Sequence, residues 1–213
     1  MKYPTSISRF LYKIQKTIFV FTSVFILSGL SCMNTASNTT EQESIDILWE
    51  DKGSKTVSFS CDDVQFVGAS HVYNVATYNS NNYKIEVRKE SGSTGSGFGM
   101  IFFHDWISEF YNICINTKGM FLVEKKSNDG NVIIKNWTAS DKLYQGFDTT
   151  NTIEMLYKPD STKFILYFNN YIAYEFFDTT HRSGKPGFYA SIPNISQTEL
   201  FGNPEKITFK LIK

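Results

Sequence analysis

The polar and aromatic side chains that could recognise a ligand lie closest together at His104, Asp105 and Trp106. An indole ring can stack on the apolar face of a sugar, while a neighbouring carboxylate and imidazole can hydrogen-bond its hydroxyl groups. Exposing a Trp on a loop is costly unless it makes a contact. This cluster is the first candidate for ligand binding, and the alternative is that Trp106 packs against a neighbouring loop.

Asn112 lies in the next apolar run and extends this candidate site. If Tyr111, Ile113 and Ile115 point into a core, strand alternation places the Asn112 amide on the outward face. It could then add a hydrogen-bonding group to the His104–Trp106 cluster.

A predicted hairpin supplies two further candidates, Tyr167 and Tyr174. Asn169 and Asn170 separate two apolar runs, and Asn accepts the positive φ angles of a two-residue hairpin loop. Pairing outward from this loop places Tyr174 opposite Ile165, on the same face as Tyr167. That face could bind a ligand or a protein partner, or a loop could cover it.

Other catalytic and metal-binding patterns are weak. The sequence has no G-x-S-x-G elbow and no phosphate-binding loop, and the Gly-rich run Ser91–Gly97 precedes a strand, which predicts a flexible hairpin loop. The segment Asn128–Asn131 is rich in oxygen ligands that suit calcium, but a hairpin turn is the favoured interpretation. We predict no metal site and no cofactor.

Three cysteines are present. Cys61 and Cys114 could form a disulfide outside the cytoplasm, or they could be two separate buried thiols. No C-x-x-C motif accompanies them, which argues against a zinc site.

The N-terminus predicts an export signal and a lipid anchor. Lys2, Arg9, Lys13 and Lys16 precede the apolar run 17–30, which is shorter than the roughly 20 residues of a membrane span. The sequence Gly29-Leu30-Ser31-Cys32 resembles a bacterial lipobox, which implies lipidation of Cys32. The alternatives are an uncleaved N-terminal anchor or ordinary signal cleavage near Ser31.

Domain boundaries follow from this pattern. We expect a signal peptide over 1–31, a polar, flexible tether over 32–44 and one folded domain over 45–213. The chain has 21 basic and 21 acidic residues, and this balance argues against nucleic-acid binding.

The folded part alternates with period two almost throughout, which is typical of antiparallel strands. In Tyr83–Lys89, Tyr83, Ile85 and Val87 face one way and charged residues face the other. No segment has a convincing helical period, so an all-β sandwich or barrel is expected. The predicted strands are 55–60, 83–89, 97–103, 109–115, 119–126, 132–137, 151–158, 163–168, 171–177, 187–192 and 207–212.

The order of several motifs resembles the concanavalin A-like lectin/glucanase superfold, in particular its laminin-G-like bacterial domains. The motifs are GFGMIFF (97–103), NWTAS (136–140), LYFNN (166–170) and SGKPGFYAS (183–191). The resemblance implies a two-sheet antiparallel jelly roll. It also makes Trp137, a second candidate for stacking on a sugar, more compatible with a core position.

Glucanases of this superfold carry alternating carboxylates in an E-x-D-x-x-E strand, and the sequence offers no convincing match. Glu86 and Glu90 have basic residues between them, and Asp46 and Glu50 have the wrong interval. We therefore expect a glycan-binding lipoprotein on the extracytoplasmic side of the bacterial cell envelope. The alternatives are a hydrolase of a different jelly-roll subgroup and an adhesin or scaffold that binds an envelope or host protein.

Overall fold

The computed structural model describes residues 49–61, 68–75, 80–104, 109–194 and 196–212. The predicted signal peptide, Cys32 and the tether lie outside these residues. Within them, no helix is long and apolar enough to cross a membrane.

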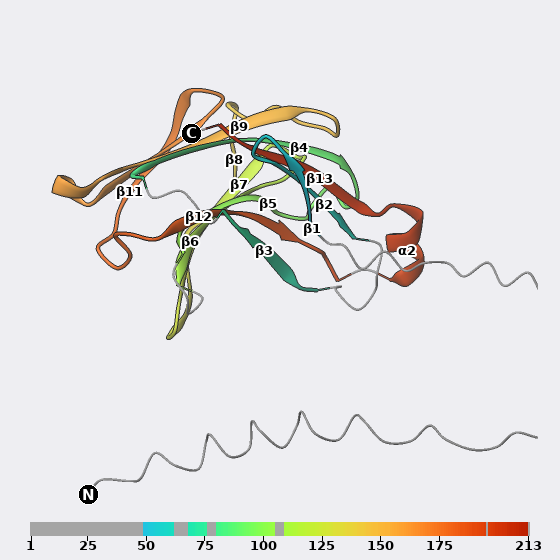
Figure 1. Cartoon of the computed structure of the whole chain (residues 1–213), viewed down its shortest axis with the longest axis horizontal. Coiled ribbons are helices and arrows are strands. Elements are labelled where there is room, and N and C mark those ends of the chain that lie inside the picture. The colour runs from blue at the N-terminus through green and yellow to red at the C-terminus, as the bar shows by residue number, and fades with distance from the viewer. Residues whose placement is uncertain (1–48, 62–67, 76–79, 105–108, 195, 213) are drawn as a thin grey trace, which may run out of the picture. The chain divides into compact units, whose positions relative to one another are not determined.

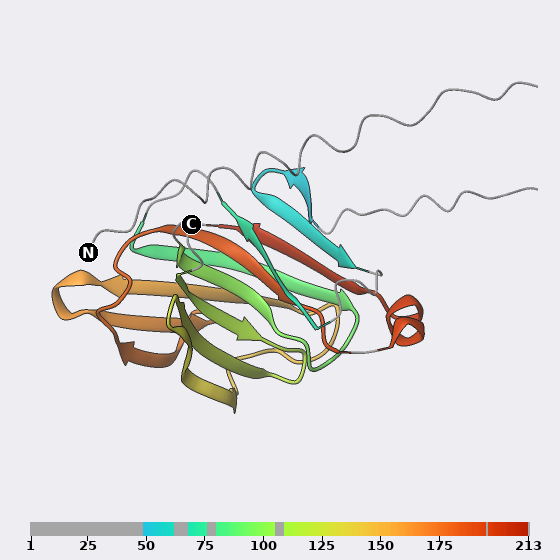
Figure 2. The same ribbon diagram turned by 90° about the horizontal axis from the view of Figure 1, so that it is seen from below.

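The described residues form thirteen strands in two antiparallel sheets that pack face to face (Figures 1 and 2). The seven-stranded sheet has the order β1-β2-β13-β4-β9-β10-β11, and the six-stranded sheet has the order β3-β12-β5-β6-β7-β8. The predicted two-sheet antiparallel sandwich is therefore confirmed. The strands are β1 (Trp49–Gly53), β2 (Thr56–Cys61), β3 (Ser70–Asn74), β4 (Asn82–Ser91), β5 (Phe98–His104), β6 (Phe110–Ile115), β7 (Met120–Ser127), β8 (Gly130–Ala139), β9 (Thr150–Lys158), β10 (Lys163–Phe168), β11 (Tyr171–Phe177), β12 (Lys185–Ser191) and β13 (Glu205–Leu211).

Two short helical segments lie between the strands of the described residues. The 3-10 turn η2 (Pro159–Ser161) precedes β10, and the helix α2 (Gln197–Gly202) precedes β13. Sequence periodicity did not predict α2, because six residues are too few to display a helical period. Its local signal is a capping box, in which the side chains of Ser196 and Glu199 exchange hydrogen bonds with each other's backbone amides.

The core lies between the sheets and is dominated by aromatic rings. Tyr111 of β6 contacts Phe164 of β10 with ring centroids 4.9 Å apart, and Phe188 of β12 stacks on Phe209 of β13 at 5.1 Å. The predicted alternation of β4 holds, since Tyr83 and its inward neighbours are fully buried. Such rings bury large apolar areas, which explains how short strands hold two sheets together.

The hairpin of β10 and β11 corrects one prediction. Asn169 and Asn170 have the expected positive φ angles of 51° and 71°. A bulge then leaves Ala173 without a partner, so Tyr174 pairs with Leu166 and not with Ile165. One extra residue moves every later side chain of the strand to the opposite face, so Tyr174 packs against the core beside Phe121. The prediction that Tyr167 and Tyr174 share a face was therefore wrong.

The cysteines and the oxygen-rich turn are also placed. Cys61 and Cys114 are both buried thiols, in two different hydrophobic clusters.

Asn128 and Asp129 form the tip of the β7–β8 hairpin, where Ser127 pairs with Gly130. The described residues contain no group of three or more potential metal ligands of the His, Cys, Asp or Glu types.

Candidate functional site

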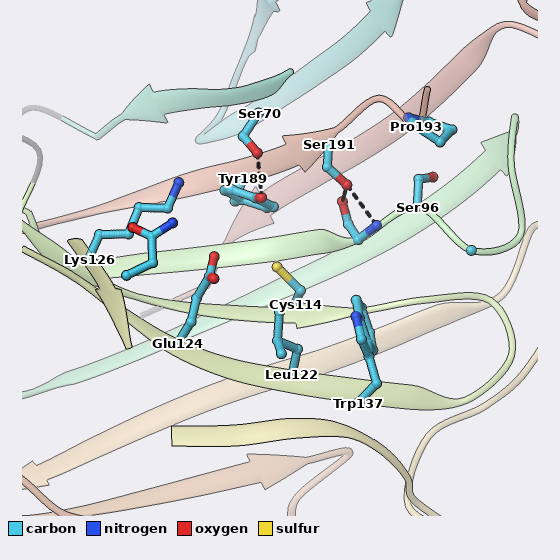
Figure 3. A pocket seen from close by; sticks show the side chains of 13 residues that line it. Ser70, Ser96, Cys114, Leu122, Glu124, Lys126, Trp137, Tyr189, Ser191 and Pro193 are labelled. Atoms are coloured by element: carbon cyan, nitrogen blue, oxygen red, sulfur yellow. Dashed lines mark hydrogen bonds between the residues drawn. The ribbon is translucent and has the colours of Figure 1, made fainter. Parts of the chain in front are cut away.

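A pocket of about 370 Å³ opens on the outer face of the six-stranded sheet (Figure 3). Its walls come from β3, β6, β7, β8 and β12 and from the turn that precedes β5. The residues lining it are Ser70, Gly95, Ser96, Gly97, Cys114, Leu122, Glu124, Lys126, Asn131, Trp137, Tyr189, Ser191 and Pro193.

Strand register explains why these side chains meet. Tyr189 of β12 pairs with Gly99 of β5, which pairs with Cys114 of β6, which pairs with Leu122 of β7. Residues directly opposite each other in a sheet share a face, so this row crosses the sheet beneath the pocket. Gly99 has no side chain, so the surface of the sheet is hollowed there between the Tyr189 ring and the Cys114 thiol.

The first glycine of the Gly97-Phe98-Gly99 motif lets the pocket wall close against the sheet. A Cβ atom on Gly97 would lie 3.2 Å from the Cβ of Cys114 and 3.4 Å from the Trp137 ring. Phe98 between the two glycines points into the core. The motif therefore combines one buried anchor with two outward positions that must stay small.

The turn from Gly92 to Gly97 forms one wall, and a buried ion pair holds it. Lys89 and Glu205 have no exposed side-chain surface, and their charged groups lie 2.5 Å apart. The Lys89 ammonium also donates to the Ser93 carbonyl at 2.7 Å, and the Ser93 amide donates to Glu205 at 2.7 Å. The prediction of a flexible hairpin loop was wrong, because the turn connects β4 of one sheet to β5 of the other and these contacts hold its backbone.

A chain of hydrogen bonds runs along the sheet beside the pocket. The Cys114 thiol donates to Asn112 Oδ1 at 3.3 Å, and Asn112 Nδ2 donates to Glu124 Oε1 at 2.7 Å. The hydroxyls of Ser70 and Tyr189 lie 2.7 Å apart across β3 and β12. The side chains of Glu124, Cys114 and Trp137 point toward the same side of the sheet in Figure 3.

Burial keeps two of these groups in their neutral form. It raises the pKa of the Cys114 thiol well above its usual value, and the nearby Glu124 carboxylate adds to this effect. Burial likewise raises the pKa of the Tyr189 phenol. Both groups can therefore act as hydrogen-bond donors at neutral pH.

The structure places the predicted ligand-binding residues that it describes in different surroundings. Asn112 lies on the outward face, but it is fully buried and contacts Glu124. His104 ends β5 with its ring 5.5 Å from that of Phe110, and Asp105 and Trp106 lie outside the described residues. Tyr167 and Tyr174 belong to β10 and β11 of the other sheet, and neither lines the pocket.

Trp137 is the residue whose favoured interpretation was wrong. It is half-buried and lines the pocket. It packs there on a hydrophobic cluster outside the main core, formed by Ile101, Phe110, Cys114 and Tyr189. Irregular pairing of β8 with β7 made its facing unpredictable from alternation alone. The clearer available signal was the alternation of the apolar Phe121 and Val123 in β7, which places Glu124 on the outward face.

No family model and no curated protein matches this sequence. Among solved structures, the domain is similar to the carbohydrate-binding module CBM66 from Bacillus subtilis. The TM-score is 0.55 at 11% identity, over 76% of this chain and 87% of the module. A second similar structure is the beta-glucanase of Bacillus licheniformis, with a TM-score of 0.52 at 9% identity, over 77% of this chain and 80% of the enzyme.

The domain has the concanavalin A-like jelly-roll fold. At this level of identity the likeness establishes the fold alone, and this fold carries unrelated functions. The function must therefore be argued from the pocket on the six-stranded sheet of the jelly roll.

Proposed function

We propose that the jelly roll binds a glycan in the pocket on the outer face of its six-stranded sheet. The observation that carries the proposal is the position of Trp137, whose indole borders a concave site lined by hydroxyl, amide and charged groups. An aromatic face and convergent polar groups are the combination that recognises a sugar, through stacking on C–H faces and hydrogen bonds to hydroxyls.

The size and composition of the pocket support this proposal. Its volume of about 370 Å³ is at the lower end of ligand sites, which suits a short stretch of a glycan. Ser70, Asn131 and Ser191 line the pocket with uncharged polar side chains. The similarity to a carbohydrate-binding module agrees with this function without establishing it.

The number of carboxylates that line the pocket favours glycan binding over glycan hydrolysis. Glycoside hydrolysis generally needs two carboxyl groups on opposite sides of the scissile bond, about 5–10 Å apart. Among the described residues that line the pocket, Glu124 is the single carboxylate. The groups that the lining does supply can hold a sugar, so we base the proposal on binding.

Replacing Trp137 with Ala should weaken glycan binding at least tenfold, because the stacking surface is lost while the polar groups remain. We would measure binding of the purified full chain to a glycan array and then titrate the best ligand by calorimetry. Tyr171→Ala is the matched control, since Tyr171 is an exposed aromatic residue on the other sheet. No binding by the wild type, or equal binding by the wild type and Trp137→Ala, would contradict the proposed site.

We further propose that Cys32 carries a lipid that anchors the protein on the extracytoplasmic side of the cell envelope. A basic start, a short apolar run and a Cys followed by a polar segment support this proposal. Stable anchoring needs more than one acyl chain, which a diacylglycerol with an N-acyl group would provide.

The Cys32→Ser variant should leave the membrane fraction for the soluble fraction or remain as the uncleaved precursor. Detergent phase partitioning and immunoblotting of cell fractions would measure this change, with Cys61→Ser as the control for loss of a thiol. A Cys32→Ser protein of mature size that still partitions into detergent would show that the lipid assignment is wrong.

A further inference from the structure

Two charged residues lie among the described residues that line the pocket, and both belong to β7. Glu124 and Lys126 are separated by one residue, so they point to the same outer face of the six-stranded sheet. Lys125 between them points the other way and forms an ion pair with Asp178. Strand geometry therefore presents one carboxylate and one ammonium side by side to the same ligand space.

Only one of the two oxygens of the Glu124 carboxylate accepts a hydrogen bond from the described residues. Oε1 accepts the hydrogen bond from Asn112, whose own oxygen accepts from the Cys114 thiol. Asn112 is fully buried, so this support is sheltered from water. Oε2 has no hydrogen-bond partner among the described residues, and it remains available to accept from a ligand.

The Lys126 ammonium is positioned without being neutralised. Its Nζ lies 5.5 Å from the centre of the Phe110 ring, which is a cation–π contact. Its backbone carbonyl contacts the His181 ring at 3.0 Å, which ties this part of β7 to the segment before β12. In the part of the chain that the structure describes, Lys126 and Glu124 form no ion pair with each other or with other residues.

We propose that Glu124 and Lys126 select an uncharged sugar and bind two neighbouring hydroxyl groups of it. This inference rests on the proposed glycan-binding function and adds the class of sugar. One hydroxyl donates to Glu124 Oε2, and its neighbour accepts from the Lys126 ammonium. A pair of adjacent hydroxyls can satisfy both charges, which otherwise face the ligand without a partner once water leaves.

The same two charges exclude acidic and amino sugars. A uronate carboxylate would meet the Glu124 carboxylate, and a protonated amino sugar would meet the Lys126 ammonium. Like charges repel each other, and the repulsion costs most free energy where water is displaced. The described lining contains one positive and one negative charge. It therefore has no net charge that would attract acidic sugars or amino sugars.

The test compares glucose-, glucuronate- and glucosamine-containing oligosaccharides on one array with the purified full chain. The wild type should bind the neutral members at least tenfold more tightly than both charged classes. Glu124→Gln should gain affinity for uronates relative to neutral sugars, because Lys126 is then unopposed and Gln can still accept from Asn112. Lys126→Met should gain relative affinity for the amino sugars, because Glu124 is then unopposed.

The Lys118→Met variant controls for loss of a positive charge elsewhere, since Lys118 is exposed and does not line the pocket. If the wild type binds sugars in a Trp137-dependent way but the two β7 variants leave the class ratios unchanged, the charge-pair inference is wrong and the glycan-binding proposal stands. A wild type that prefers uronates or amino sugars also overturns the inference alone. If the wild type binds no glycan of any class, both proposals fail.

Discussion

Replacing Glu205 with Ala should lower the free energy of unfolding by about 3–5 kcal/mol, because removing one partner of a buried ion pair leaves the other charge buried and uncompensated. Burial lowers the pKa of the Lys89 ammonium, and the Glu205 carboxylate opposes that effect. The same carboxylate accepts from the Ser93 amide and from the Ser96 hydroxyl. The variant would therefore lose both charge balance and the support of the pocket wall.

Urea unfolding followed by Trp fluorescence would measure this decrease in the free energy of unfolding. If Glu205→Ala does not fold, the milder Glu205→Gln variant would replace it in the same measurement. Lys210→Ala is the matched control, since Lys210 lies on the same strand β13 but its ion pair with Glu86 is exposed to solvent. Exposed pairs contribute less than about 1 kcal/mol. A Glu205→Ala protein as stable as the Lys210→Ala control would refute the structural role of the buried pair.

Gly99→Ala should destabilise the domain by about 3 kcal/mol or more, at or above the upper end of the usual cost of overpacking. A Cβ atom at Gly99 would lie 2.1 Å from the Ile113 carbonyl oxygen, and this neighbour is backbone that cannot rotate away. β5 and β6 would have to move apart at the centre of the six-stranded sheet. Because Gly99 lies in the row beneath the pocket, the same movement should also reduce glycan binding.

Gly95→Ala provides the comparison on the same segment. A Cβ atom there would meet nothing closer than the Ser93 hydroxyl at 3.9 Å, so we expect stability close to that of the wild type. Thermal unfolding of the two variants side by side would test the difference. Equal melting temperatures for Gly99→Ala and Gly95→Ala would contradict the close approach of β5 and β6.

Local sequence patterns were sufficient to predict most of the strands. The alternation of Tyr83, Ile85 and Val87 requires one buried face, and Asn169-Asn170 meets the backbone requirement of a tight hairpin. The outward position of Asn112 followed from the same parity argument. These features depend on neighbouring residues, which is why a single sequence reveals them.

The pocket depends on residues that are distant in sequence, and it could not be predicted in the same way. Lys89 and Glu205 are 116 positions apart, and no local pattern indicates that their charges meet inside the protein. Tyr174 was misplaced because a bulge in β11 changes which face its side chain occupies, whereas the core position expected for Trp137 came from the resemblance to a fold family and not from the pairing of β8. A bulge is a property of two paired strands, so alternation within one strand cannot reveal it.

The burial of the two described cysteines bears on the chemical reactivity of the folded domain. Cys61 sits in the main core and Cys114 sits under the pocket, so the six-stranded sheet lies between the two sulfur environments. Because only the thiolate reacts readily, burial and the raised pKa of Cys114 protect it from oxidants. In the folded jelly roll, we therefore expect either thiol to react only after a local opening that exposes its sulfur.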